Sequence, residues 1–154
     1  NNAKHVQRCL ERGLAVGEGD AEKDLINYPN RSFDTAILNQ AIQQFYEPRK
    51  VLNELLRIAE KAIITIPNFG YWKVRLNLLL TGTMPITKTL PYSWYNTPNL
   101  HMSSIKDFYN LCNLDNIKVI KSISISSNKI GDITSNNLEI KNLVSELGVF
   151  VVSK

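Results

Sequence analysis

The sequence predicts an α/β fold in which a parallel sheet is covered by helices on both sides. Two observations carry this prediction. The run Ala62–Ile66 is β-branched and apolar without alternation, which is typical of a strand buried on both faces. The segment after Pro48 instead repeats its apolar residues at helical spacing. Because such strands and helices alternate over the first 66 residues, crossover helices joining parallel strands are expected.

The first 40 residues predict one helix and two strands. Apolar residues at helical spacing indicate a short helix over residues 2–12, and Gly13 is a typical helix stop. Leu14–Val16 is typical of a short buried strand. Pro29–Ser32 has the composition of a turn, and it leads into a second predicted strand, Phe33–Leu38.

Pro48 predicts the start of the next helix, because proline is tolerated in a first helical turn. One stripe of this helix is expected to be buried, and it consists of Val51, Leu52, Leu55 and Ile58.

The rest of the chain predicts a less regular succession of elements. Residues 71–80 indicate a short amphipathic helix with Trp72, Leu76, Leu79 and Leu80 on or near one face. Residues 81–98 have no period and predict a long ordered loop. Ser104 and Asp107 have the spacing of a capping box at the start of a helix that runs to about Asn113. The remaining predictions are a strand at Lys118–Ser126, a loop over 126–137, a helix at Leu138–Leu147 and a strand at Val149–Val152.

Length and composition indicate one globular domain. The chain has 154 residues, of which 44% are hydrophobic and 21% are charged. No apolar run approaches the roughly 20 residues that a membrane helix needs. Cys9 and Cys112 lie far apart, so a reducing compartment is expected. We therefore expect a soluble cytoplasmic protein without a membrane partner.

Charge is unevenly distributed along the chain. Residues 61–106 contain five lysines and arginines and no acidic residue, together with both tryptophans. Such a segment could bind nucleic acid, cap an anionic small-molecule site or contact a partner protein. Five bases over 46 residues are too sparse for the clustered stripe that nucleic acid requires, which argues against nucleic acid.

Metal and nucleophile motifs are absent from the sequence pattern. His5 and Cys9 stand four residues apart on the first predicted helix, but no second pair accompanies them. We therefore assign structural roles to both residues and to Cys112, and predict no metal site.

Four segments together resemble the second half of a class I S-adenosylmethionine-dependent methyltransferase domain. They are Gly19–Ala21, Ser32–Asp34, the helix at Pro48 and Ile64–Asn68. More specifically, three longer segments are similar to the MetW family of methionine-biosynthesis proteins, namely Pro67–Arg75, Met84–Lys88 and Leu90–His101.

This resemblance implies a Rossmann-like, three-layer sandwich and a part in methionine synthesis. Family members are associated with homoserine O-acyltransferase, which they are thought to assist as a partner. The alternative is an S-adenosylmethionine-dependent methyltransferase that acts on a small molecule. Residues 1–154 would form a single partial methyltransferase-like domain, and residues 69–101 would form an inserted segment, here called the cap segment.

The methyltransferase pattern implies two pairs of cofactor-binding residues. Asp20, with Ala21 beside it, follows a predicted strand and would lie next to adenine, although aspartate is also a common helix cap. Asn39 and Gln40 follow the next strand and would lie near the sulfonium and the substrate, although amides after a strand also suit a turn.

Five residues after the strand Ala62–Ile66 are candidates for substrate or partner contact. Trp72 could instead pack the following helix onto the sheet, and the two basic residues could be solvated surface charges. The five are Asn68, Tyr71, Trp72, Lys73 and Arg75. The catalytic residues, if any, stay unassigned.

Two features of the class I pattern are missing from the sequence. Gly17–Gly19 follows a later strand, so it is not the glycine-rich turn that opens the first helix of such domains. The acidic residue expected after the second strand is also absent. We therefore expect a chain that lacks its first strands and leaves a face of its central strands open. S-adenosylmethionine is then expected to bind the full-length protein and to bind these 154 residues poorly.

Overall fold

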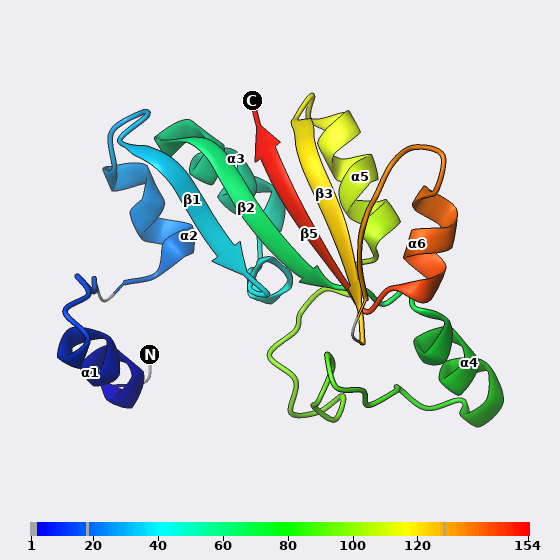
Figure 1. Cartoon of the computed structure of the whole chain (residues 1–154). Coiled ribbons are helices and arrows are strands. Elements are labelled where there is room, and N and C mark those ends of the chain that lie inside the picture. The colour runs from blue at the N-terminus through cyan, green and yellow to red at the C-terminus, as the bar shows by residue number, and fades with distance from the viewer. Residues whose placement is uncertain (1–2, 18, 128) are drawn as a thin grey trace.

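The computed structural model describes residues 3–17, 19–127 and 129–154, and within them one five-stranded sheet forms the centre of the fold (Figure 1). The strands lie in the order β1-β2-β5-β3-β4. Their bounds are Phe33–Asn39 for β1, Ala59–Pro67 for β2, Lys118–Ser126 for β3, Lys129–Asp132 for β4 and Leu147–Ser153 for β5.

The pairing directions make this sheet mixed. β1 and β2 are parallel and joined by a crossover helix, with Ile37 opposite Ile63. The last strand, β5, lies between β2 and β3 and is antiparallel to both. The predicted α/β class is confirmed, and the relation between the late strands, which the sequence leaves open, is antiparallel.

Helices pack on one face of the sheet and share one hydrophobic core with it. Leu52 of the predicted helical stripe is fully buried, and the ring of Phe108 lies 4.5 Å from the ring of Phe150 on β5. The longer helices are α1 (Ala3–Glu11), α3 (Pro48–Ile58), α4 (Trp72–Thr81), α5 (Ile105–Leu114) and α6 (Leu138–Val144). A short helix α2 (Ala21–Asp24) and two 3₁₀ turns, η1 (Leu25–Asn27) and η2 (Ile42–Gln44), complete the helical elements.

The opposite face of the sheet is largely open. Ile37, Ile63 and Val151 share one row of this face, and Ile37 is 69% exposed. The helices that join the main core, α3, α5 and α6, lie on the other side. The described residues thus leave this face open, and the helices that the sequence predicts on both sides of the sheet are present there on one side only. The expectation that Ala62–Ile66 is buried on both faces is wrong, because Ile63 and Thr65 are only half-buried.

The predicted strand at Leu14–Val16 is not present. These residues have no regular structure, and Leu14 is exposed. A strand needs a hydrogen-bonding neighbour. Among the described residues, β1 pairs with β2 alone and leaves its outer edge unpaired.

The predicted loop over 126–137 contains a strand, β4, which pairs with β3. Two buried serines of β3 explain why this polar segment joins the sheet. Ser122 Oγ donates to the main-chain oxygen of Ile133, and Ser124 Oγ donates to that of Gly131, each at 3.1 Å. The serine side chains of β3 therefore hold β4, and the residue that follows it, against the sheet.

The helix predicted at 71–80 forms as α4, but its predicted apolar face is not buried. Val74 is the buried residue of this helix, whereas Leu79 is 80% exposed. Trp72 is also exposed, so packing of this side chain into the core, which the sequence favours, is wrong. Gly82 ends the helix at φ 66°, a left-handed conformation that glycine adopts without strain.

Candidate functional site

Several segments with predicted functional residues meet at one edge of the sheet. β1 and β2 both end at the lower edge in Figure 1, α2 begins near that level, and the cap segment extends beneath it. Ligands of open α/β sheets bind outside the carboxyl ends of the parallel strands. The candidate site therefore lies at this edge of the sheet.

Asp20 lies in a cavity of about 450 Å³ that Ala21, Asp24 and Tyr28 also line. Its Oδ1 accepts a hydrogen bond from the Glu22 amide at 3.0 Å, so Asp20 caps α2. Its Oδ2 lies 3.2 Å from Lys23 Nζ. The hydrogen bond with Lys23 and the Glu22 amide hold the pKa of the Asp20 carboxyl below its ordinary value, which keeps this acceptor ionised.

The chemistry of this cavity fits an adenine edge in part. Ala21 is the first residue of α2, so its N–H has no acceptor within the helix. A carboxylate acceptor beside such an N–H matches the amino group and a ring nitrogen of adenine. Asn39 and Gln40 do not line this cavity. Of the two predicted cofactor-binding pairs, Asp20 and Ala21 therefore line this cavity, and Asn39 and Gln40 lie outside it.

Asn39 and Gln40 lie at the end of β1, where the chain leaves the sheet. The amide of Gln40 donates to the main-chain oxygen of Thr65 at 2.9 Å, which fixes the end of β1 against β2. Gln40 has φ 49°, a left-handed conformation that few residues with a side chain adopt. Such backbone strain is more common at functional positions than elsewhere.

Gln43 is a residue that the sequence analysis did not single out. Its side chain is 3% exposed, and its Nε2 donates to the main-chain oxygen of Gln40 at 2.9 Å. Its Oε1 is buried and has no hydrogen-bond partner among the described residues. The main-chain oxygen of Gln43 accepts from the amides of Leu100 and His101, which ties the end of the cap segment to η2. The sequence offers one signal for this residue, the adjacent pair Gln43 and Gln44. The burial of Gln43, however, depends on contacts with residues that are distant in the sequence.

Asn68 is buried and connects four parts of the chain. Its side chain is 2% exposed. Its Nδ2 donates to the main-chain oxygens of Asn142 and Ser145, each at 2.7 Å. Its Oδ1 accepts from the amides of Gly70, at 2.9 Å, and Ile105, at 3.2 Å. These contacts place Asn68 as an anchor where the cap segment leaves β2.

The other four candidates divide between the interior and the surface. Tyr71 is buried against Val74 in a second small core, whereas Trp72, Lys73 and Arg75 are exposed. Lys73 Nζ lies 5.6 Å from the centre of the Trp72 ring, a cation–π distance. Arg75 Nε donates to the main-chain oxygen of Gly70 at 2.6 Å. The charged ends of Lys73 and Arg75 therefore lie where a ligand or partner can reach them.

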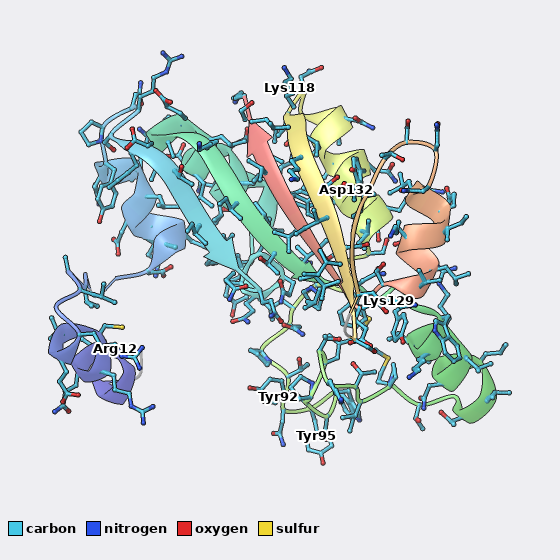
Figure 2. The ribbon with its side chains drawn as sticks, viewed as in Figure 1. Arg12, Tyr92, Tyr95, Lys118, Lys129 and Asp132 are labelled. Carbon is cyan, nitrogen blue, oxygen red and sulfur yellow. The ribbon has the colours of Figure 1, made fainter. Side chains whose placement is uncertain are left out.

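The cap segment exposes an unusual number of large apolar side chains. Trp94 is 73% exposed, and its ring meets that of Tyr95 edge to face at 5.7 Å. Tyr92 and Tyr95 lie on the side of the segment away from the sheet (Figure 2). The other exposed apolar residues of this region are Leu76, Leu78, Leu79, Leu80, Ile86, Leu100 and Met102.

Membrane-spanning helices and metal-binding clusters are both absent from the described part of the chain. None of its helices is long and apolar enough to cross a membrane. Within the same residues, no three histidine, cysteine, aspartate or glutamate side chains gather closely enough to hold a metal ion.

The strand order, with an antiparallel last strand inserted beside two parallel ones, defines a Rossmann-like domain of the methyltransferase type. A crystal structure of an S-adenosylmethionine-dependent methyltransferase from Thermotoga maritima superposes with a TM-score of 0.68 at 16% identity, covering 98% of this chain and 69% of that one. Another from Archaeoglobus fulgidus gives 0.64 at 11% identity, covering 99% and 73%. At these identities the likeness establishes the fold alone.

The sequence comparisons are more specific. The model of the family described as methionine biosynthesis protein MetW matches residues 1–152, so the chain belongs to the MetW family. A bifunctional methionine biosynthesis protein MetXA/MetW from Rhodopirellula baltica is 31% identical over 113 residues. That alignment covers 73% of this chain and 18% of the relative, so the chain spans less than a fifth of that protein's length.

Proposed function

We propose that this protein assists a homoserine O-acyltransferase by binding it through the cap segment, in the cytoplasm. The exposed apolar surface of that segment is the observation that carries the proposal. Trp94 and Leu79 leave most of their side chains in solvent. Many exposed large apolar side chains within one segment favour an interaction site, because soluble monomers rarely expose large apolar patches.

Two further observations support the choice of partner. The family resemblance implies assistance to the acyltransferase, and the relative from Rhodopirellula baltica is named as a bifunctional MetXA/MetW protein. In addition, residues 61–106 contain no acidic side chain, so the cap segment suits a partner surface that carries carboxylates.

The experiment measures turnover of the purified acyltransferase with and without the full-length protein, and the affinity between the two by calorimetry. Replacing Lys73 and Arg75 by glutamine is expected to weaken the complex, and the melting temperature is measured alongside because the Arg75 change also removes the hydrogen bond to Gly70. Lys118→Gln with Lys121→Gln removes the same charge from β3 and is expected to have no effect, since Lys118 lies at the opposite edge of the sheet (Figure 2). Absence of both binding and activation by the unmodified protein would contradict the proposal.

A second candidate function is methyl transfer from S-adenosylmethionine to a small molecule. Buried Gln43 favours it, because its Oε1 has no hydrogen-bond partner within the described part of the chain, and such an acceptor suits the N–H or O–H group of a ligand. S-adenosylmethionine supplies an electrophilic methyl group when bound. Asp20 and Ala21 would hold its adenine, and Asn39 and Gln40 would orient the acceptor at the edge of the sheet.

This second candidate is tested without the acyltransferase. Full-length protein is titrated with S-adenosylmethionine, and methyl transfer to candidate small molecules is then measured. Transfer that is lost in Asn39→Ala and in Gln40→Gly would support it. Gln40→Gly is the suitable change there, because glycine tolerates φ 49°. Absence of cofactor binding, together with acyltransferase activation, would leave only the first function.

A further inference from the structure

An apolar cavity of about 270 Å³ lies within and beside the cap segment. Small-molecule pockets range from about 300 to 1,000 Å³, so the volume of this cavity is just below that range. It is of the order of one bulky amino-acid side chain. Its apolar lining includes Phe69, Met84, Leu90, Tyr92, Trp94 and Met102.

The floor of the cavity is well packed. Leu90 is buried in the second small core, against which Phe69 also packs. Two hydrogen bonds close the turn that holds Leu90. The amide of Thr87 donates to the main-chain oxygen of Leu90 at 2.9 Å, and the amide of Leu90 donates to Thr87 Oγ1 at 3.1 Å. The base of the cavity is therefore formed before any partner arrives.

The rim is exposed and adaptable. Trp94, Tyr92 and Met102 leave more than half of their surface in solvent. Methionine side chains adjust to different apolar partners, and tryptophan and tyrosine are enriched at the centres of binding interfaces. A formed floor with an exposed aromatic rim is the arrangement that receives an anchor side chain from another protein.

Basic residues near the cavity indicate the charge of the partner surface that surrounds this anchor side chain. Lys73 and Lys88 line a neighbouring cavity, together with Glu146, and that cavity shares Pro85 with this one. Within the described residues no carboxylate forms an ion pair with either lysine. Complementary charge steers two proteins toward the correct encounter, while desolvated apolar anchors supply most of the affinity.

We propose that this cavity receives one bulky apolar side chain of a partner protein, projecting from a surface that carries aspartate and glutamate. This inference rests on the proposed function, in which the partner is the homoserine O-acyltransferase. It adds the position of the anchor and the chemistry of the surface around it.

The test measures the affinity of full-length variants for the purified acyltransferase by calorimetry. Trp94→Ala removes the rim, and Thr97→Trp fills the cavity that Thr97 lines. Each is expected to weaken binding at least about tenfold, the scale of an interface anchor. Ile130→Ala is the matched control, because Ile130 is equally exposed but lies on β4, outside the cap segment, and it is expected to bind like the unmodified protein. Melting temperatures verify that each variant is folded.

The outcomes separate this inference from the function on which it rests. If the unmodified protein neither binds nor activates the acyltransferase, both fail together. If it binds and Trp94→Ala and Thr97→Trp bind equally well, the cavity is not the anchor site, although the proposed function stands. A Lys88→Glu variant should bind more slowly at low salt, and an unchanged association rate would overturn the acidic character assigned to the partner surface.

Discussion

Asn68 and Asn142 lie 74 residues apart in the sequence and are joined by a 2.7 Å hydrogen bond from Asn68 Nδ2 to the main-chain oxygen of Asn142. The same side chain makes three further hydrogen bonds, to Ser145, Gly70 and Ile105. A single buried amide therefore connects the end of β2 with α5 and α6. The position of the cap segment depends on this connection.

Replacement of Asn68 by alanine is expected to destabilise the protein by about 3 kcal/mol. The change leaves two main-chain oxygens and two amides without this partner. Each such group costs about 1–3 kcal/mol when it is left fully unsatisfied, and water that enters the vacated space recovers most of the sum. Urea denaturation measures the effect. Asn113→Ala, at an exposed position of α5, is the control, and equal stability of the two variants would show that the Asn68 contacts contribute nothing.

Gly70 is expected to tolerate no side chain. A Cβ atom at this position would lie 2.7 Å from Asn142 Oδ1 and 2.9 Å from Asn68 Oδ1. Both oxygens accept main-chain hydrogen bonds, Asn68 Oδ1 from Ile105 and Asn142 Oδ1 from Lys106, so Gly70→Ala should cost about 1–3 kcal/mol of stability. Gly17→Ala is the matched change, because nothing lies within 4 Å of its Cβ. A melting temperature for Gly70→Ala as high as that for Gly17→Ala would contradict the close approach.

The elements that sequence predicts well are those with local signals. The buried stripe of α3 begins after Pro48, and the Ser104–Asp107 capping box starts α5, because helix caps and periodicity act within a few residues. Leu14–Val16 fails as a strand and β4 is missed, because both outcomes depend on a neighbouring strand rather than on their own composition.

The same distinction applies to the candidate site. Asp20 is a candidate because of its position in the methyltransferase-like segment Gly19–Ala21, and in the structure it lines a cavity. The burial of Gln43 depends on the return of the chain at Leu100 and His101, far along the sequence. The cavity above Leu90 likewise arises from a loop without periodicity. Such features require the folded chain.

The ion pair between Arg49 and Asp115 should make stability depend on acidity. Arg49 Nε donates to Asp115 Oδ1 at 2.8 Å, and the Asp115 side chain is only 4% exposed. The hydrogen bond from Arg49 holds the pKa of the Asp115 carboxyl below its ordinary value of 3.8. Because the folded pKa is the lower one, this stabilisation is fully present above the unfolded pKa and is lost as the pH falls through the folded pKa.

Asp115→Asn tests this dependence. The variant should be less stable than the unmodified protein at pH 7, and the difference should shrink as the pH falls below about 4, the unfolded value for aspartate. Urea denaturation at several pH values measures both curves. A difference that stays constant down to strongly acidic pH would show that the charge of Asp115 does not contribute.

The two cysteines should differ sharply in reactivity. Cys112 is fully buried on α5, and burial raises the pKa of its thiol to about 12. At pH 8 the reactive thiolate of Cys112 would then be roughly one part in ten thousand, since each unit of pKa changes the fraction tenfold. Cys9 on α1 is partly exposed. A thiol reagent should therefore modify one cysteine per native chain and two after unfolding in guanidinium, and Cys9→Ser should abolish the native reaction. Equal rates for both thiols in the native protein would mean that α5 opens readily and that the core around Phe108 is not closed.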